Sequence, residues 1–116
     1  MKVRNLLAKS IVIGATAATL TGAIASYVWA DGAKDLYDDR CAGCHGPSGK
    51  GDGPAAKMLQ PAPQNFATAL KGKSDDYIKK IIKEGGAATG KSASMPAASD
   101  LSDDQVKSLA DYIKHL

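Results

Sequence analysis

The five residues Cys41-Ala42-Gly43-Cys44-His45 decide the fold expected for this chain. Their pattern, C-x-x-C-H, is the attachment signature of c-type haem. On a tight turn, two thiols three positions apart can each add to one vinyl group of a haem, and the next residue places its imidazole under the iron. The sequence therefore predicts one covalently bound haem c, with Cys41 and Cys44 as thioether anchors and His45 as the proximal iron ligand.

Three other uses of two nearby cysteines fit the sequence less well. A disulfide between Cys41 and Cys44 would close a very small loop and constrain little of the unfolded chain. A thioredoxin-like redox pair belongs near a βαβ pattern, for which the sequence has no strands. A zinc site needs about four ligands, and the only further histidine, His115, lies next to the C-terminal residue. We expect His115 to be a surface residue of the last helix.

Bulky apolar side chains are scarce outside the first thirty residues. Of the 51 residues in the hydrophobic class, 19 lie at positions 1–30, and 13 of the remaining 32 are alanine. Without the two cysteines, 17 large apolar side chains are left for positions 31–116. A domain of this size has a marginal core by itself, so a bound prosthetic group is expected to complete its interior.

Residues 1–30 are predicted to be a secretory signal peptide. Basic residues precede an uncharged apolar stretch from Ile11 to Val28, and small residues favour cleavage after Ala30. The alternative is an uncleaved membrane anchor, because residues 11–30 approach the ~20 residues that a spanning helix needs. Cleavage would take the formal net charge from +3 to zero, so bulk charge gives no sign of nucleic-acid binding. The functional domain, residues 31–116, is then expected in the periplasm.

Positions 31–116 predict helices and loops but no strand. They hold one valine and four isoleucines, without an alternating run of β-branched or aromatic residues. Apolar spacing and capping residues predict helices at 33–40, 55–59, 75–84 (capped by Ser74) and from a Ser102/Gln105 capping box through Lys114. The expected fold is all-α, with three main helices and a short one wrapped around the haem.

The ligand on the other side of the iron decides the function. A second strong protein ligand makes the iron six-coordinate and suited to electron transfer. After cleavage only Met58 and Met95 can supply a thioether. Met58 lies in the short predicted helix, where we interpret it as a core filler. Met95 is the predicted distal ligand, because small residues surround it and Pro96 pushes it toward an extended conformation.

The order of these elements resembles that of class I c-type cytochromes, of the small bacterial monohaem kind. The resemblance covers residues 31–116 and runs from helix to C-x-x-C-H, Gly/Pro loop, middle helix, Met-Pro loop and terminal helix. It implies a small cytochrome c fold in which the first and last helices cross. The residues expected at this crossing are Ala33, or Gly32 in its place, with Tyr37, Leu109 and Tyr112.

The same resemblance implies further contacts around the haem. The outer ring nitrogen of His45 would donate a hydrogen bond to the carbonyl of Pro54 in the Gly53-Pro54 step, which orients the imidazole and makes it a better ligand. Prolines and an aromatic residue would lie along the haem edge, and polar neighbours would reach a propionate. The residues concerned are Pro61, Pro63 and Phe66 for the edge, and Gln64 or Asn65 for the propionate.

The sequence thus predicts a periplasmic, monomeric electron carrier with a His45/Met95 haem that transforms no substrate and, once cleaved, binds no membrane. Other redox proteins are expected to dock briefly at an exposed haem edge near Cys44. The lysine-rich stretch 71–83 could meet an acidic partner, but acidic residues interrupt it, which favours an ordinary solvated face. Two rival hypotheses remain open: a small haem enzyme or ligand sensor, and a haem-bearing subunit or anchored domain of a larger redox complex.

Overall fold

The structure is a computed structural model that describes residues 23–116, with side chains from Gly32 onward. Within this part of the chain every regular element is a helix, which confirms the predicted all-α class. The elements are α1 (Ala23–Arg40), α2 (Ala42–His45), the 3₁₀ helix η1 (Ala56–Met58), α3 (Phe66–Ala69), α4 (Asp75–Ala88) and α5 (Asp103–Ile113).

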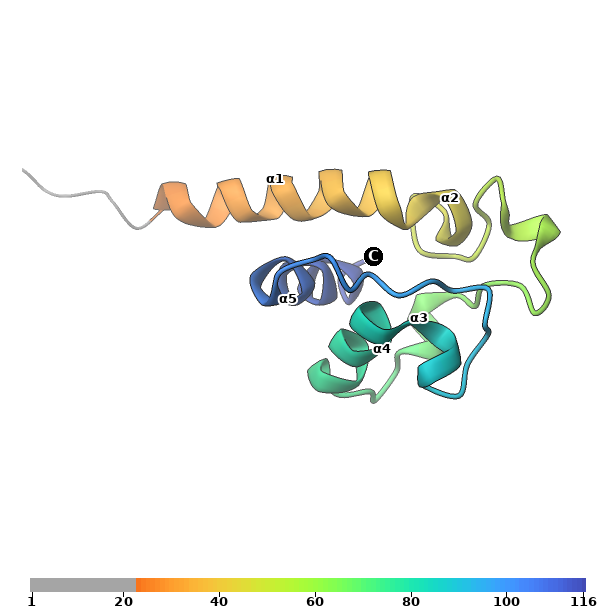
Figure 1. The fold of residues 1–116 in the computed structure, drawn as a ribbon. Helices are drawn as coiled ribbons and strands as arrows, with labels where there is room; N and C mark the ends of the chain where they lie inside the picture. The colour runs from red at the N-terminus through yellow and green to blue at the C-terminus, as the bar shows by residue number, and fades with distance from the viewer. Residues whose placement is uncertain (1–22) are drawn as a thin grey trace, which may run out of the picture.

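Helix α5 packs against both α1 and α4, so it lies between them (Figure 1). Tyr37 and Leu109 are fully buried where α1 and α5 cross, and the rings of Tyr37 and Tyr112 are 5.4 Å apart between centroids. Ala33 is buried in the same crossing, whereas a Cβ at Gly32 would meet no atom within 4 Å. The predicted crossing is confirmed, and Ala33 rather than Gly32 is its small residue.

The rest of the core comes from the inner faces of α4 and α5. Its buried members besides Tyr37 and Leu109 are Ile78, Ile82, Leu101, Val106, Ala110 and Ile113. Those on α4 and α5 recur at helical spacing, as the sequence predicts for two amphipathic helices, and Leu101 lies in the loop just before α5. The core therefore fills the space between the three long helices, and the haem-attachment motif lies beyond it at the end of α1.

The caps of α4 and α5 are those predicted. The Ser74 hydroxyl accepts a hydrogen bond from Tyr77 N at 3.2 Å, and the Ser102/Gln105 capping box is complete. The end of α4 differs from the prediction of 75–84. Gly85 leaves the helical conformation with φ 80°, and the chain then makes one further turn to Ala88. Glycine makes this kink possible because it has no Cβ to oppose a positive φ.

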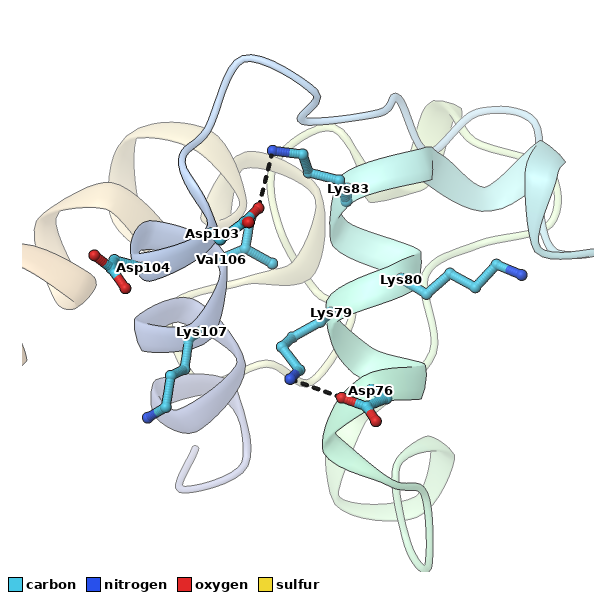
Figure 2. Close-up of a pocket in the computed structure, with 8 residues that line it drawn as sticks. All are labelled: Asp76, Lys79, Lys80, Lys83, Asp103, Asp104, Val106 and Lys107. Carbon is cyan, nitrogen blue, oxygen red and sulfur yellow. Dashed lines mark ion pairs between the residues drawn. The ribbon is translucent and has the colours of Figure 1, made fainter.

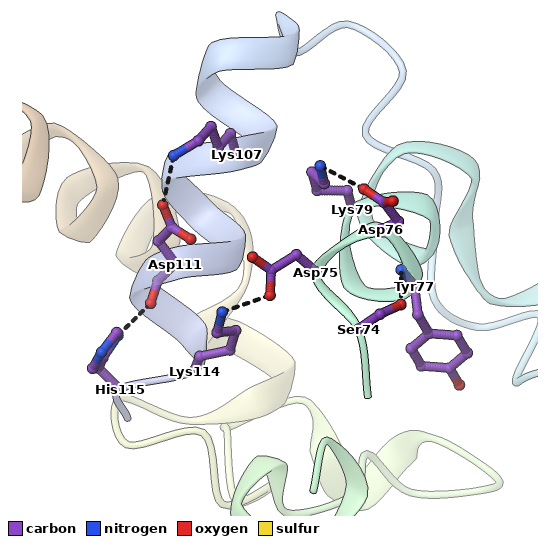
Figure 3. Close-up of polar contacts among 9 residues, drawn as sticks. All are labelled: Ser74, Asp75, Asp76, Tyr77, Lys79, Lys107, Asp111, Lys114 and His115. Carbon is purple, nitrogen blue, oxygen red and sulfur yellow. Dashed lines mark hydrogen bonds and ion pairs between the residues drawn. The ribbon is translucent and has the colours of Figure 1, made fainter. Parts of the chain in front are cut away.

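Ion pairs join the ends of these helices. Lys114 Nζ lies 2.6 Å from Asp75 Oδ1, which links the end of α5 to the start of α4 (Figure 3). Arg40 at the end of α1 forms a two-pronged pair with Asp100, with both N–O distances 3.0 Å. The hydrogen bond from Arg40 holds the pKa of Asp100 below its ordinary value. These exposed pairs fix the helix ends rather than contribute much stability.

Helix α1 begins at Ala23, ten residues before the predicted start at 33. Residues 1–22 lie outside the described part of the chain, so the predicted signal peptide 1–30, its cleavage after Ala30 and the alternative anchor stay predictions. No helix within residues 23–116 is long and apolar enough to cross a membrane.

The segment between α2 and α4 departs most from the sequence-based expectation. The helix predicted at 55–59 is the single 3₁₀ turn η1, and Met58 on it is 79% exposed, so its interpretation as a core filler is wrong. A 3₁₀ turn of three residues turns only one side chain toward the protein interior. In η1 that residue is Ala56, so Met58 is left in solvent. Helix α3 was not predicted, and Asn65 caps it by accepting a hydrogen bond from Ala67 N at 2.9 Å.

Candidate haem site

Helix α2 holds the C-x-x-C-H motif in one helical turn directly after α1. Cys41 N donates to Tyr37 O at 2.8 Å, and His45 N donates to Cys41 O at 2.9 Å. Residues three and four positions apart share one face of a helix, so Cys41, Cys44 and His45 face the same side of this turn. Both thiols are free and half-buried, and burial raises the pKa of Cys41 to about 11. The turn thus presents two free thiols and an imidazole together.

The loop after His45 folds back onto this turn and closes it. Gly51 N donates to His45 O at 2.8 Å, and Ala55 N donates to Gly43 O at 2.9 Å. Gly53 lies closest: a Cβ there would be 2.5 Å from Gly43 O and 2.6 Å from Ala42 O. Real side chains do not tolerate such distances, so this position needs glycine. Residues 51–55 therefore cover one side of the backbone of the C-x-x-C-H turn.

A buried hydrogen bond ties α1 to the same loop. The Tyr37 hydroxyl donates to Gly46 O at 2.6 Å, and burial raises the pKa of Tyr37 to about 12. Gly46 directly follows His45 and has φ 80°, so the bond fixes the chain where it leaves the motif. The sequence analysis placed Tyr37 in the crossing with α5 but missed this second role, which no pattern of side-chain spacing signals.

His45 is half-buried, and the surroundings of one of its ring nitrogens are not explained by the polypeptide alone. Its Nδ1 is buried and has no hydrogen-bond partner among residues 23–116, while its ring stacks on Phe66 with centroids 4.7 Å apart. The hydrogen bond expected from this nitrogen to the Pro54 carbonyl is therefore not made. Burial lowers the pKa of His45, which favours the neutral imidazole that binds metals. An orphaned, neutral imidazole beside two free thiols fits a haem group.

Met95 lies in the loop from α4 to α5, and its backbone packs against Gly85 and Gly86, where α4 kinks. We call these two glycines the seat of Met95. Gly86 N donates to Met95 O at 3.0 Å, and Ala98 N donates to Ile82 O at 2.9 Å. A Cβ at Gly85 would lie 2.9 Å from Met95 O, and one at Gly86 would overlap Ser92 O. The sequence signal for this close packing is the pair Gly85-Gly86, which the sequence analysis did not connect with Met95.

Figure 1 shows α2 and the connection from α4 to α5 toward the same end of the molecule. Phe66 joins this end, because its N donates to Gly49 O at 2.8 Å and its ring covers His45. Of the predicted propionate donors, Asn65 uses its side-chain oxygen to cap α3, and Gln64 is exposed. Pro54 and Pro61 are exposed, and Pro63 is half-buried.

The other polar clusters of the described chain hold no comparable donor set. The cleft between α4 and α5 is lined mainly by lysines and aspartates (Figure 2): Lys83 pairs with Asp103 across it, and Lys79 pairs with Asp76 on the same helix, α4. His115 is exposed, as predicted, with Nδ1 2.6 Å from the Asp111 carbonyl oxygen (Figure 3). Within residues 23–116, no three His, Cys, Asp or Glu side chains are grouped to hold a metal ion.

The chain has an all-α fold with two free thiols and an imidazole on one helical turn. These features are those of proteins that bind haem covalently. Comparison with known families agrees: the family model described as Cytochrome c matches residues 30–116. The chain therefore belongs to the cytochrome c family. No curated protein matches it. The domain binds haem c covalently, with Cys41 and Cys44 at the C-x-x-C-H spacing, and its function is haem-based electron transfer with redox partners.

Proposed function

We propose that the protein is a periplasmic, monomeric electron carrier with one six-coordinate haem, ligated by His45 and Met95. The observation that carries this proposal is the buried, unpartnered Nδ1 of His45 on the turn that also holds the two thiols. An imidazole in that position is neutral and free to ligate iron through Nε2 when Nδ1 carries the proton. The seat of Met95 on Gly85 and Gly86 supports the choice of distal ligand.

The residues have separate roles in this proposal. Cys41 and Cys44 would hold the haem through two thioether bonds, each made by adding S–H across one vinyl group, with sulfur on one carbon and hydrogen on its neighbour. His45 and Met95 would hold the iron, one through its imidazole and the other through its thioether, so that protein side chains would supply both ligands. The haem supplies a one-electron couple, and a thioether ligand raises its potential relative to a second histidine.

The polypeptide then keeps the ligands in place in both oxidation states. The loop that closes on α2 holds His45, and Phe66 covers one side of its ring. Pro54 remains the proposed acceptor for His45 Nδ1, which needs an acceptor once the imidazole ligates iron. Apolar surroundings raise the potential further, because they disfavour the extra charge of the ferric state.

The proposed periplasmic location depends on the predicted signal peptide, residues 1–30. The basic start, apolar stretch and small residues before position 31 support export and cleavage. The intact mass of the exported holoprotein tests this: we expect the mass of residues 31–116 plus one haem. A mass that includes residues 1–30 would favour the anchored alternative. Gel filtration at several concentrations tests the monomeric state, for which we expect a single elution volume.

The ligand assignment is tested by absorption spectra of two variants. Met95→Ala should lose the weak long-wavelength ferric band that a thioether ligand gives, and its ferrous form should bind carbon monoxide quickly. Met58→Ala is the matched control and should keep the band. Loss of the band in Met58→Ala alone would overturn the assignment. Tight carbon monoxide binding to the unmodified ferrous protein would instead favour the rival hypothesis of a haem enzyme or ligand sensor.

A further inference from the structure

The side chains of Phe66 and His45 form an aromatic contact at the edge of the core. Their ring centroids are 4.7 Å apart and their planes meet at 28°, which is a stacked arrangement. The contact joins α3 to the turn that holds the C-x-x-C-H motif. Both residues are half-buried, whereas the rings of Tyr37 and Tyr112 pack in the crossing of α1 and α5. The stack therefore belongs to the haem site and not to the crossing.

The backbone around Phe66 fixes the position of its ring. Phe66 N donates a hydrogen bond to Gly49 O at 2.8 Å, and Leu70 N donates one to Phe66 O at 3.0 Å. Directly before Phe66, the side chain of Asn65 caps α3. Phe66 is therefore held both by its own helix and by the loop that follows His45.

The ring of Phe66 also packs directly on the backbone of that loop. Gly49 is buried with φ 66°, and a Cβ there would lie 2.4 Å from Phe66 Cδ2. The same Cβ would lie 3.3 Å from Leu116 Cδ1, so the side chain of Leu116 borders the same space. This position needs glycine, because any side chain would displace the ring. The ring of Phe66 is thus set between the loop backbone and the imidazole of His45.

The imidazole of His45 depends on this contact for its orientation. Its Nδ1 is buried and has no hydrogen-bond partner among residues 23–116. The helical turn fixes the backbone of His45, but the ring can still rotate about the side-chain bonds. Aromatic rings prefer offset-stacked or edge-to-face arrangements, so the face of Phe66 favours one plane for the imidazole. A ring contact therefore provides the orientation that a hydrogen bond usually gives to a ligating histidine.

We propose that Phe66 is a positioning residue, which sets the plane of the His45 imidazole and keeps water away from one of its faces. This inference rests on the proposed function, because it concerns His45 as the ligand of a bound haem. It differs from the family resemblance, which implies a place for Phe66 along the haem edge. The stack on His45 supports the new role. Through the imidazole, Phe66 would tune the reduction potential without touching the iron.

The first test is proton NMR of the ferric holoprotein, in which unpaired electron density shifts the haem methyl resonances. The pattern of these shifts depends on the orientation of the imidazole plane. Phe66→Leu keeps an apolar side chain but removes the stack, so we expect a changed pattern. We also expect a lower reduction potential, because water then reaches the imidazole and favours the ferric charge. Phe66→Tyr keeps the ring and should match the unmodified protein in both. The thioether band should remain in both variants, because Met95 lies on another segment.

Leu70→Ala is the matched control for a loss of stability. Leu70 is half-buried, packs against the same core and directly follows α3, but it takes no part in the stack. We expect Leu70→Ala to unfold at a lower denaturant concentration and to keep both the methyl pattern and the reduction potential. An unchanged pattern in Phe66→Leu, or an equal change in Leu70→Ala, would overturn the proposal.

Nuclear Overhauser contacts in the ferrous holoprotein test the position of Phe66 without a substitution. We expect contacts between the ring protons of Phe66 and those of His45. Contacts to haem methyl groups without any to His45 would place Phe66 along the haem edge and overturn the proposal. Failure of the proposed function would look different: the unmodified protein would then lack the thioether band or contain no covalently bound haem.

Discussion

The two segments that carry the proposed axial ligands are held by the polypeptide in different ways. His45 lies on a helical turn that continues α1 and is closed on its outer side by Gly51, Gly53 and Ala55. Met95 lies in a loop that three backbone hydrogen bonds hold to α4, with residues 93 and 94 exposed. The proximal side, the turn with His45, is therefore an integral part of the helical fold. The distal side, the loop with Met95, is attached to the outside of α4. Substitutions on the proximal side should therefore lower the stability of the fold. Substitutions on the distal side should weaken the ligation of the iron by Met95 and leave the fold intact.

The largest expected effect comes from Gly53→Ala on the proximal side. The new Cβ would meet the carbonyl oxygens of Ala42 and Gly43, which are backbone atoms that cannot rotate away. We expect a loss of about 3 kcal/mol in the free energy of unfolding and a low yield of holoprotein. Gly43→Ala is the control, because a Cβ there meets no atom within 4 Å. Denaturant unfolding should leave Gly43→Ala nearly unchanged; equal damage in both variants would contradict the close packing.

Gly86→Ala makes the corresponding change on the distal side. Its Cβ would overlap Ser92 O and press on Met95 Cβ at 3.2 Å. The loop should shift, so we expect covalent haem to be retained while the thioether band weakens and the reduction potential falls. Ala93→Ser, at an exposed position of the same loop, should keep both. An unchanged reduction potential in Gly86→Ala would contradict the idea that the distal loop positions the Met95 ligand.

Tyr37→Phe tests the bond that joins α1 to the proximal loop. Removing the hydroxyl leaves the buried Gly46 carbonyl with only its longer bond from Gly49 N at 3.2 Å, which should cost about 1 kcal/mol. The thioether band should not change, because Met95 lies on another segment. Tyr112→Phe provides the comparison, since Tyr112 packs against Tyr37 but is only half-buried. If both variants unfold at the same denaturant concentration, the hydroxyl has no special role.

The smallest expected effect concerns the exposed pair of Arg40 and Asp100, which ties the end of α1 to the loop before α5. Because the folded-state pKa of Asp100 is below its ordinary value of 3.8, its contribution to stability is present above that pH and is lost as the pH falls through the lower value. Asp100→Asn should therefore unfold slightly earlier than the unmodified protein at pH 7, and the difference should shrink as the pH falls below the ordinary value of 3.8. Asp104→Asn is the control, because it removes an exposed carboxylate that forms no ion pair among the described residues.

Local features were predictable because each depends on residues close together in the sequence. The caps at Ser74 and Ser102, the apolar faces of α4 and α5, and the C-x-x-C-H turn all follow from spacing. The crossing at Tyr37 followed from the family resemblance. The fit of Gly53 on α2 and of Gly86 under the Met95 loop was not predicted, because it is made by backbone atoms that leave no side-chain pattern.

Met58 shows a second limit of sequence reasoning. Its neighbours suggest a helix with a buried side, but the segment makes only one 3₁₀ turn and leaves the side chain in solvent. The same holds for charge: the lysines can be counted from the sequence, but only the structure separates those that are ion-paired from those that are not. The role of each residue therefore depended on how the elements pack.

The most direct test of the account is proton NMR of the ferrous holoprotein with isotope-labelled methionine methyl groups. A methyl group held over the haem iron is shifted far upfield by the ring current of the porphyrin. We predict one such resonance, present in Met58→Ala and missing in Met95→Ala. An upfield methyl that survives in Met95→Ala, or no shifted methyl in the unmodified protein, would contradict the ligation by His45 and Met95.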